Sequence, residues 1–126
     1  GDASSKESIS EVLAEGGFTG VVHAIGMLFE SDLNRFASGS GSLPSAGATY
    51  DVITRQTAFN AVDALVESPS AKGAQPPFAF VSAAEARWDF DQNFKGTPAE
   101  WLHRYLIAKR AVESKLIDEY GSAGAI

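Results

Sequence analysis

Two short apolar segments, residues 18–25 and 78–81, constrain the fold of this chain more than any other feature. Each has the composition of a strand, and the residues between them include a long helical pattern over residues 50–66. Strands that alternate with helices predict βαβ units and a parallel sheet. Because residues 18–25 are apolar on both sides, we expect them to form a buried strand of that sheet. The sequence therefore predicts an α/β fold.

Three further helices complete the predicted order. A short amphipathic helix covers residues 5–15, and a second short helix covers residues 27–36. The last helix begins at a capping sequence, residues 97–100, where a threonine hydroxyl precedes a proline and a glutamate. Two parallel strands do not make a stable sheet alone. We therefore expect one incomplete domain over residues 1–126, with further strands before Gly1 and after Ile126 or from another chain.

Charge and residue content narrow the classes of function. The net charge of −6 argues against binding to a nucleic-acid backbone or to an anionic membrane surface. The chain has no cysteine, which removes disulfides and thiolate catalysis. No histidine or carboxylate pair has metal-ligand spacing, so we predict no metal site. The apolar runs are too short for a transmembrane segment.

Tyr105 and Lys109 are the strongest candidates for chemistry. They are four residues apart in the last predicted helix, so they share a face, with about 5–6 Å between their Cβ atoms. A lysine ammonium beside a phenol lowers the pKa of the phenol, which would suit Tyr105 to general acid–base catalysis. The alternative is a half-buried aromatic ring beside a solvated lysine.

Other polar residues have both a functional and a structural interpretation. Ser82, at the end of the second strand, either contacts a substrate or bonds to the local backbone. His23 is either a ligand-binding or a core-edge histidine, and the second is favoured. His103 is expected to face away from Tyr105 into solvent.

A few remaining charged residues are expected at the surface. Asp89 and Asp91 are expected in a solvated loop, and Arg110 is expected to pair with Glu113 on the surface of the last helix.

These motifs, in this order, resemble the middle of an atypical or extended short-chain dehydrogenase/reductase. The similarity is greatest to the NAD(P)-binding members associated with mitochondrial quinone biosynthesis and respiratory complex I. Residues 21–26 resemble the family's fourth strand and the turn near the cofactor ribose, residues 78–82 its fifth strand, and Tyr105 and Lys109 its catalytic pair. The resemblance implies a partial Rossmann-like, doubly wound parallel sheet that lacks the first βαβ unit.

The resemblance also implies roles for individual residues. Tyr105 would exchange a proton with the substrate oxygen, Lys109 would bind the nicotinamide ribose, and Ser82 would hold the substrate. The implied cofactor is NADP or NAD, which would carry the hydride. The turn residues that would lie near it are His23, Ala24 and Gly26.

The chain departs from the family pattern at several positions. No glycine-rich turn follows a strand and opens a helix, because residues 39–41 and 121–124 have the wrong context for a phosphate site. Many extended members place the catalytic hydroxyl where this chain has Ala83 or Ala84. Thr54 stands where the family often has asparagine. The residues that assist the tyrosine–lysine pair in this family are thus altered in this chain.

Two functional hypotheses follow from the resemblance and these departures. The first is an NAD(P)-binding accessory or structural subunit with degraded catalysis, held among the protein subunits of a larger assembly. The second is an active NAD(P)-dependent oxidoreductase that uses Tyr105 and Lys109 on a carbonyl or hydroxyl substrate. The resemblance implies an organelle as the location, a mitochondrion or alternatively a chloroplast.

Overall fold

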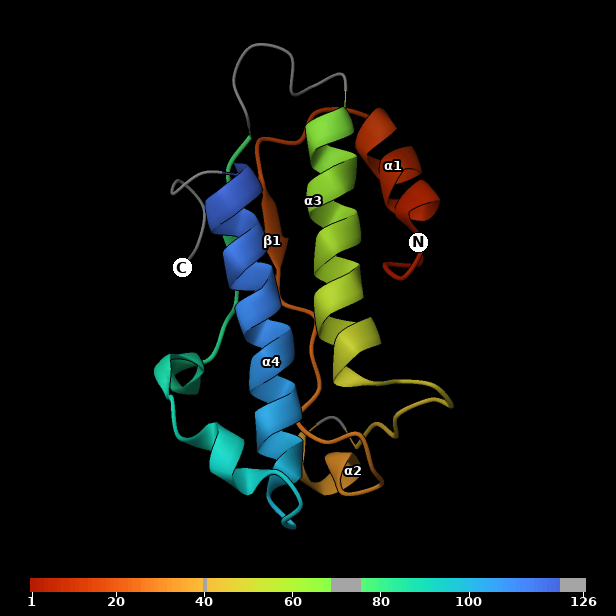
Figure 1. Cartoon of the computed structure of the whole chain (residues 1–126). Helices are drawn as coiled ribbons and strands as arrows, with labels where there is room; N and C mark the ends of the chain where they lie inside the picture. The colour runs from red at the N-terminus through yellow and green to blue at the C-terminus, as the bar shows by residue number, and fades with distance from the viewer. Residues whose placement is uncertain (40, 69–75, 121–126) are drawn as a thin grey trace.

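The computed structural model describes residues 1–39, 41–68 and 76–120, and Figure 1 shows how they are arranged. Two predicted features, the end of the last helix at Gly121 and the glycine-rich residues 121–124, lie outside the described residues. The elements follow one another in the order α1 (Lys6–Ala14), β1 (Val21–His23), α2 (Asn34–Ala37), the π-helical turn η1 (Asp51–Gln56), α3 (Thr57–Glu67), β2 (Phe78–Phe80), the 3₁₀ turns η3 (Ala84–Arg87) and η4 (Asp91–Phe94), α4 (Glu100–Lys115) and the π-helical turn η5 (Leu116–Tyr120).

The two strands pair in parallel, as the sequence predicts. Val21 lies opposite Phe78, and His23 lies opposite Phe80. The ladder continues past β2, because the Val81 N–H donates to the His23 carbonyl at 3.0 Å. The chain between the strands includes α3, so β1, α3 and β2 form a βαβ unit. The protein is thus a mixed helix-and-strand structure, mostly helical, with a small parallel sheet.

The helices cover one face of this sheet. Figure 1 shows α3 and α4 side by side in front of β1, with α1 packed against α3. The core lies where these elements meet. Full burial of one large apolar side chain contributes about 1.5–3 kcal/mol. Every layer supplies such side chains to the core: Leu13, Val62, Leu65, Phe78, Phe80, Val112 and Leu116.

The opposite face of the sheet is open, which corrects the prediction of a strand buried on both sides. Phe78 and Phe80 point toward the helices and are buried, but Val22 is 72% exposed and Val81 is 53% exposed. The first strand is also shorter than predicted, since only Val21–His23 pairs. The strand carries apolar side chains on both of its faces, but the described residues cover only the face that packs against the helices.

Helix starts are only partly predicted by their capping sequences. The Ser5 hydroxyl caps α1 by accepting from the Ser8 N–H at 3.2 Å. The last helix begins at Glu100 rather than at the predicted cap, because residues 97–99 form a tight turn closed by the Thr97 carbonyl. The helix predicted over residues 27–36 forms only as the four-residue α2.

A buried ionic cluster joins the 3₁₀ turns to α4. Asp91 is completely buried, and its carboxylate accepts from Arg110 at 2.8 and 3.0 Å and contacts His103 Nδ1 at 2.7 Å. His103 and Arg110 are seven residues apart and so share one face of α4. The predictions of a solvated Asp91, a solvated His103 and an Arg110–Glu113 surface pair are therefore wrong. The turns η3 and η4 fold back along α4 and bring Asp91 onto that face.

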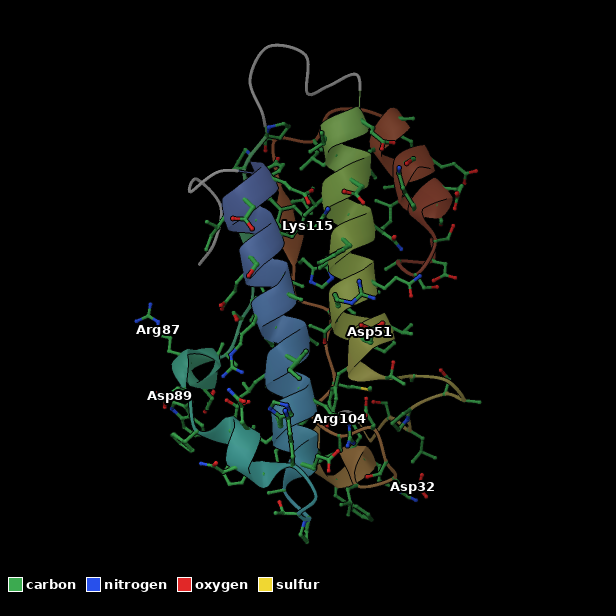
Figure 2. All side chains as sticks on the ribbon, in the orientation of Figure 1. Asp32, Asp51, Arg87, Asp89, Arg104 and Lys115 are labelled. Carbon is green, nitrogen blue, oxygen red and sulfur yellow. The ribbon has the colours of Figure 1, made fainter. Side chains whose placement is uncertain are left out.

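Replacing Asp91 should destabilise the protein. Asp91→Asn leaves Arg110 without its carboxylate partner, so we expect the free energy of unfolding to fall by about 2 kcal/mol in urea unfolding at pH 7. Asp89→Asn is the matched control, because Asp89 lies two residues away and points outward in Figure 2. Equal effects of the two substitutions would contradict the assignment of the cluster.

The effect of Asp91→Asn should depend on pH in a defined direction. The hydrogen bonds from Arg110 hold the pKa of Asp91 well below its usual value of 3.8, with His103 adding to the effect. A carboxylate with a depressed folded-state pKa stabilises the protein fully above its unfolded-state pKa and loses that contribution at lower pH. The stability difference between wild type and Asp91→Asn should therefore shrink as the pH falls below about 4.

Candidate functional site

The candidate site forms where the carboxyl ends of the two strands meet α4. Lys109 is 5% exposed, and its ammonium donates to the Val81 carbonyl, just past β2, at 2.7 Å. The same ammonium lies 4.8 Å from the ring centre of Phe80 and 5.6 Å from that of Tyr105, which precedes it by one helical turn. These contacts place the lysine between α4 and the end of the sheet.

A cavity of about 370 Å³ opens beside this lysine. Four of the residues predicted for the site line it together: Tyr105 and Lys109 from α4, and Ala24 and Gly26 from the segment after β1. The other lining residues come from the chain around α2: Met27, Leu28, Asn34, Ser38 and Ser42. The structure thus brings the tyrosine–lysine pair and the turn after β1 to one cavity.

Gly26 leaves open space between two polar groups. A Cβ atom at Gly26 would lie 3.9 Å from Lys109 Nζ and 4.0 Å from Thr54 Oγ1. The Thr54 hydroxyl is buried and has no hydrogen-bond partner among the described residues. It is carried by the π-helical turn η1, a distortion that often occurs at functional sites. A lysine ammonium and an unpaired hydroxyl therefore flank the space beside Gly26.

Asn34 organises the cavity wall, and the sequence analysis did not identify it. Its side-chain oxygen accepts from the N–H groups of Leu28 and Phe29 at 3.2 Å each, and its amide donates to the Ser42 carbonyl at 3.4 Å. The Tyr50 hydroxyl holds the same segment by donating to the Leu28 carbonyl at 2.8 Å. The only signal in the sequence is an asparagine close to a glycine- and serine-rich stretch, which is too common to predict this role.

Ser82 lies in a different cavity from Tyr105. Its hydroxyl donates to the Glu113 carboxylate at 2.5 Å. Both residues line a second cavity of about 730 Å³ at the open face of the sheet, together with Val22, Val81 and Arg87. Val81 lines this second cavity, whereas Lys109, which donates to the Val81 carbonyl, lines the first. The structure therefore does not bring Ser82 into the cavity that holds the tyrosine–lysine pair.

His23 points into the protein rather than into the cavity. Its Nε2 atom is 2.8 Å from Thr57 Oγ1, and the residue is 4% exposed. Burial lowers the pKa of His23, and the positive charge of Lys109 lowers it further. A neutral histidine packed on Phe80 and α3 is a core residue, in agreement with the structural interpretation of the sequence.

The ionisation of the tyrosine–lysine pair is opposite to the expectation from its spacing. Burial raises the pKa of Tyr105, and the carboxylate of Glu85 raises it further. Burial lowers the pKa of Lys109, against the opposing effect of Glu113. The ammonium lies over the face of the Tyr105 ring, where it interacts with the π electrons. The predicted lowering of the phenol pKa is therefore wrong for this geometry.

Comparisons with protein-family models, with curated proteins and with solved structures find no match to this chain. The described residues contain no group of three or more metal-binding side chains that could hold a metal ion.

Tyrosine titration tests the electrostatics of this site. All three tyrosines have raised pKa values through burial, with that of Tyr50 raised to about 12. We therefore expect no phenolate absorbance below pH 10 in a spectrophotometric titration of the folded protein. A phenol that ionises near pH 8 in the wild type, and that disappears in both Tyr105→Phe and Lys109→Met, would contradict the geometry.

Proposed function

We propose that this chain is a domain of the short-chain dehydrogenase/reductase type, with a partial Rossmann-like sheet, that binds NADP or NAD as an accessory subunit with degraded catalysis. One observation carries the proposal: Tyr105 and Lys109 share a cavity with Ala24 and Gly26 at the carboxyl ends of parallel strands. In open α/β sheets, ligands bind in the crevice beyond the carboxyl ends of the strands.

The residues around Gly26 suit the ribose at the nicotinamide end of the cofactor. The Lys109 ammonium has three N–H donors, of which the hydrogen bond to the Val81 carbonyl uses one. The buried Thr54 hydroxyl lacks a partner within the described residues. A sugar with several hydroxyl groups would satisfy both, and the missing side chain of Gly26 leaves room for it. When bound, the cofactor would supply hydride-transfer chemistry. The described residues offer no comparable site for the phosphate groups of the cofactor, since no described glycine-rich turn joins a strand to a helix.

Two features favour the accessory role over turnover. The raised pKa of Tyr105 keeps the phenol protonated at neutral pH, so it is a poor general base. Ser82 donates its hydrogen bond to Glu113 instead of facing Tyr105. The second candidate is an active NAD(P)-dependent oxidoreductase acting on a carbonyl or hydroxyl substrate. It is favoured by one observation, that Tyr105 reaches the cavity wall and stays protonated, as a general acid must.

The open face of the sheet supports a role within an assembly of protein subunits. Parallel sheets are normally covered on both faces, whereas Val22 and Val81 are largely exposed here. We propose that protein covers this face. No helix in the described part of the chain is long and apolar enough to cross a membrane. Placement in a mitochondrion, or alternatively a chloroplast, rests on the family resemblance alone.

Binding of NADH and NADPH tests the proposal directly. The purified protein should bind at least one of them, as measured by the fluorescence of the reduced nicotinamide. Lys109→Met removes a charged hydrogen-bond donor, and Gly26→Ala fills the space beside it, so each should weaken binding about tenfold or more. Lys95→Met is the matched control, because Lys95 is exposed and does not line the cavity. It should leave binding unchanged.

Two results would overturn parts of the proposal. The absence of saturable binding by either nucleotide would exclude the cofactor site. Turnover of a carbonyl substrate that is lost in Tyr105→Phe would replace the accessory role by the oxidoreductase.

A further inference from the structure

Lys109 is a buried amine in the wall of the 370 Å³ cavity. Within residues 1–39, 41–68 and 76–120, no carboxylate forms an ion pair with it. Its hydrogen bond goes to a backbone carbonyl, and aromatic rings lie on two sides. Removing an ammonium from water shifts the equilibrium toward the neutral amine, so burial lowers the pKa of Lys109, although the charge of Glu113 acts in the opposite direction. A neutral amine has a free lone pair and is a nucleophile.

Lys115, six residues later on α4, provides an internal comparison. Its side chain is 9% exposed, but the residue as a whole is only partly buried, less deeply than Lys109. It lies between α4 and α3 in Figure 2, where its ammonium is 2.9 Å from Asp63 and 2.6 Å from Glu119. Burial acts to lower the pKa of Lys115, but the bonds to Glu119 and Asp63 raise it overall. The two lysines thus differ in their partners, and Lys109 is also the more deeply buried of the two.

The setting of Lys109 also provides a place for an electrophile. The amine is part of the wall of the 370 Å³ cavity, whose size is near the lower end of the range for ligand pockets, about 300–1,000 Å³. Tyr105 lies on the same wall and stays protonated at neutral pH. Asn34 adds a polar side chain to the wall. A small molecule with hydroxyl groups fits such a surface better than an apolar one.

We propose that Lys109 is a carbonyl-reactive amine that forms an imine with a small hydroxyaldehyde or hydroxyketone bound in this cavity. The amine nitrogen adds to the carbonyl carbon, and one proton moves from nitrogen to oxygen, which gives a carbinolamine. The C–O bond then breaks as Tyr105 donates its proton to the departing hydroxyl, which leaves as water. The nitrogen lone pair forms the C=N bond, and the remaining N–H proton returns to the Tyr105 phenolate.

This inference is independent of the proposed function. It requires the amine, the cavity and a carbonyl compound, and it requires neither a dinucleotide nor a hydride. A protein that binds no NADPH can still form the imine, and a protein that binds NADPH can fail to form it. The two proposals can therefore fail separately.

Reductive trapping tests the inference. The protein is incubated with glycolaldehyde and cyanoborohydride, which adds hydride to the imine carbon and leaves a stable secondary amine on the lysine. Peptide mass spectrometry then gives the rate of modification at each lysine. We expect Lys109 to react at least tenfold faster than Lys95, which is exposed, and Lys115, which is partly buried and ion-paired. Modification of Lys109 no faster than these two would overturn the proposal.

Two controls separate the local environment from a general effect of folding. In urea the three lysines should react at similar rates, since the selectivity depends on the folded cavity; selectivity that persists in urea would overturn the proposal. Tyr105→Phe should slow trapping at Lys109 by about tenfold or more, because it removes the proton donor. The same variant should leave the rate at Lys95 unchanged. An unchanged rate at Lys109 would overturn the part assigned to Tyr105.

Discussion

The hydrogen bond from the Lys109 ammonium to the Val81 carbonyl is the contact on which the candidate site depends. It joins the middle of α4 to the point where β2 ends, and the adjacent Val81 N–H is held by β1 through the His23 carbonyl. One peptide segment therefore links the sheet to the helix. Because Tyr105 precedes Lys109 by one turn, the same bond directs the tyrosine toward the chain that leaves β1. The position of the cavity follows from these backbone contacts.

Burial without an ion pair to any described carboxylate explains the chemistry of this site. An ion pair would hold the lysine charged, as Asp63 and Glu119 do for Lys115. Lys109 has rings and a carbonyl instead, so burial lowers its pKa, and the neighbouring phenol is kept protonated by its own burial. The geometry therefore favours proton donation by Tyr105 and nucleophilicity or hydrogen bonding by Lys109. It does not favour proton abstraction by a phenolate.

Sequence reasoning was most successful where local patterns decide the structure. Strand–helix–strand order predicts the parallel pairing, and helical spacing predicts that Tyr105 and Lys109 share a face. Both are confirmed, and the order of elements also brings Gly26 to the same cavity. The failures depend on contacts between distant residues. Nothing near Asp91 distinguishes it from Asp89, yet only Asp91 meets Arg110 and is buried. The pKa direction of Tyr105 likewise depends on burial, which spacing along one helix does not show.

The central claim is that Lys109 is buried at the strand ends and forms no ion pair with a described carboxylate, and this can be measured directly. NMR titration of the lysine side-chain carbons next to the ammonium groups, with Lys109→Arg and Lys115→Arg for assignment, gives both pKa values in one sample. We predict that Lys109 titrates below the ordinary value of 10.5 and that Lys115 titrates above it. A pKa of Lys109 at or above that of Lys115 would contradict the account.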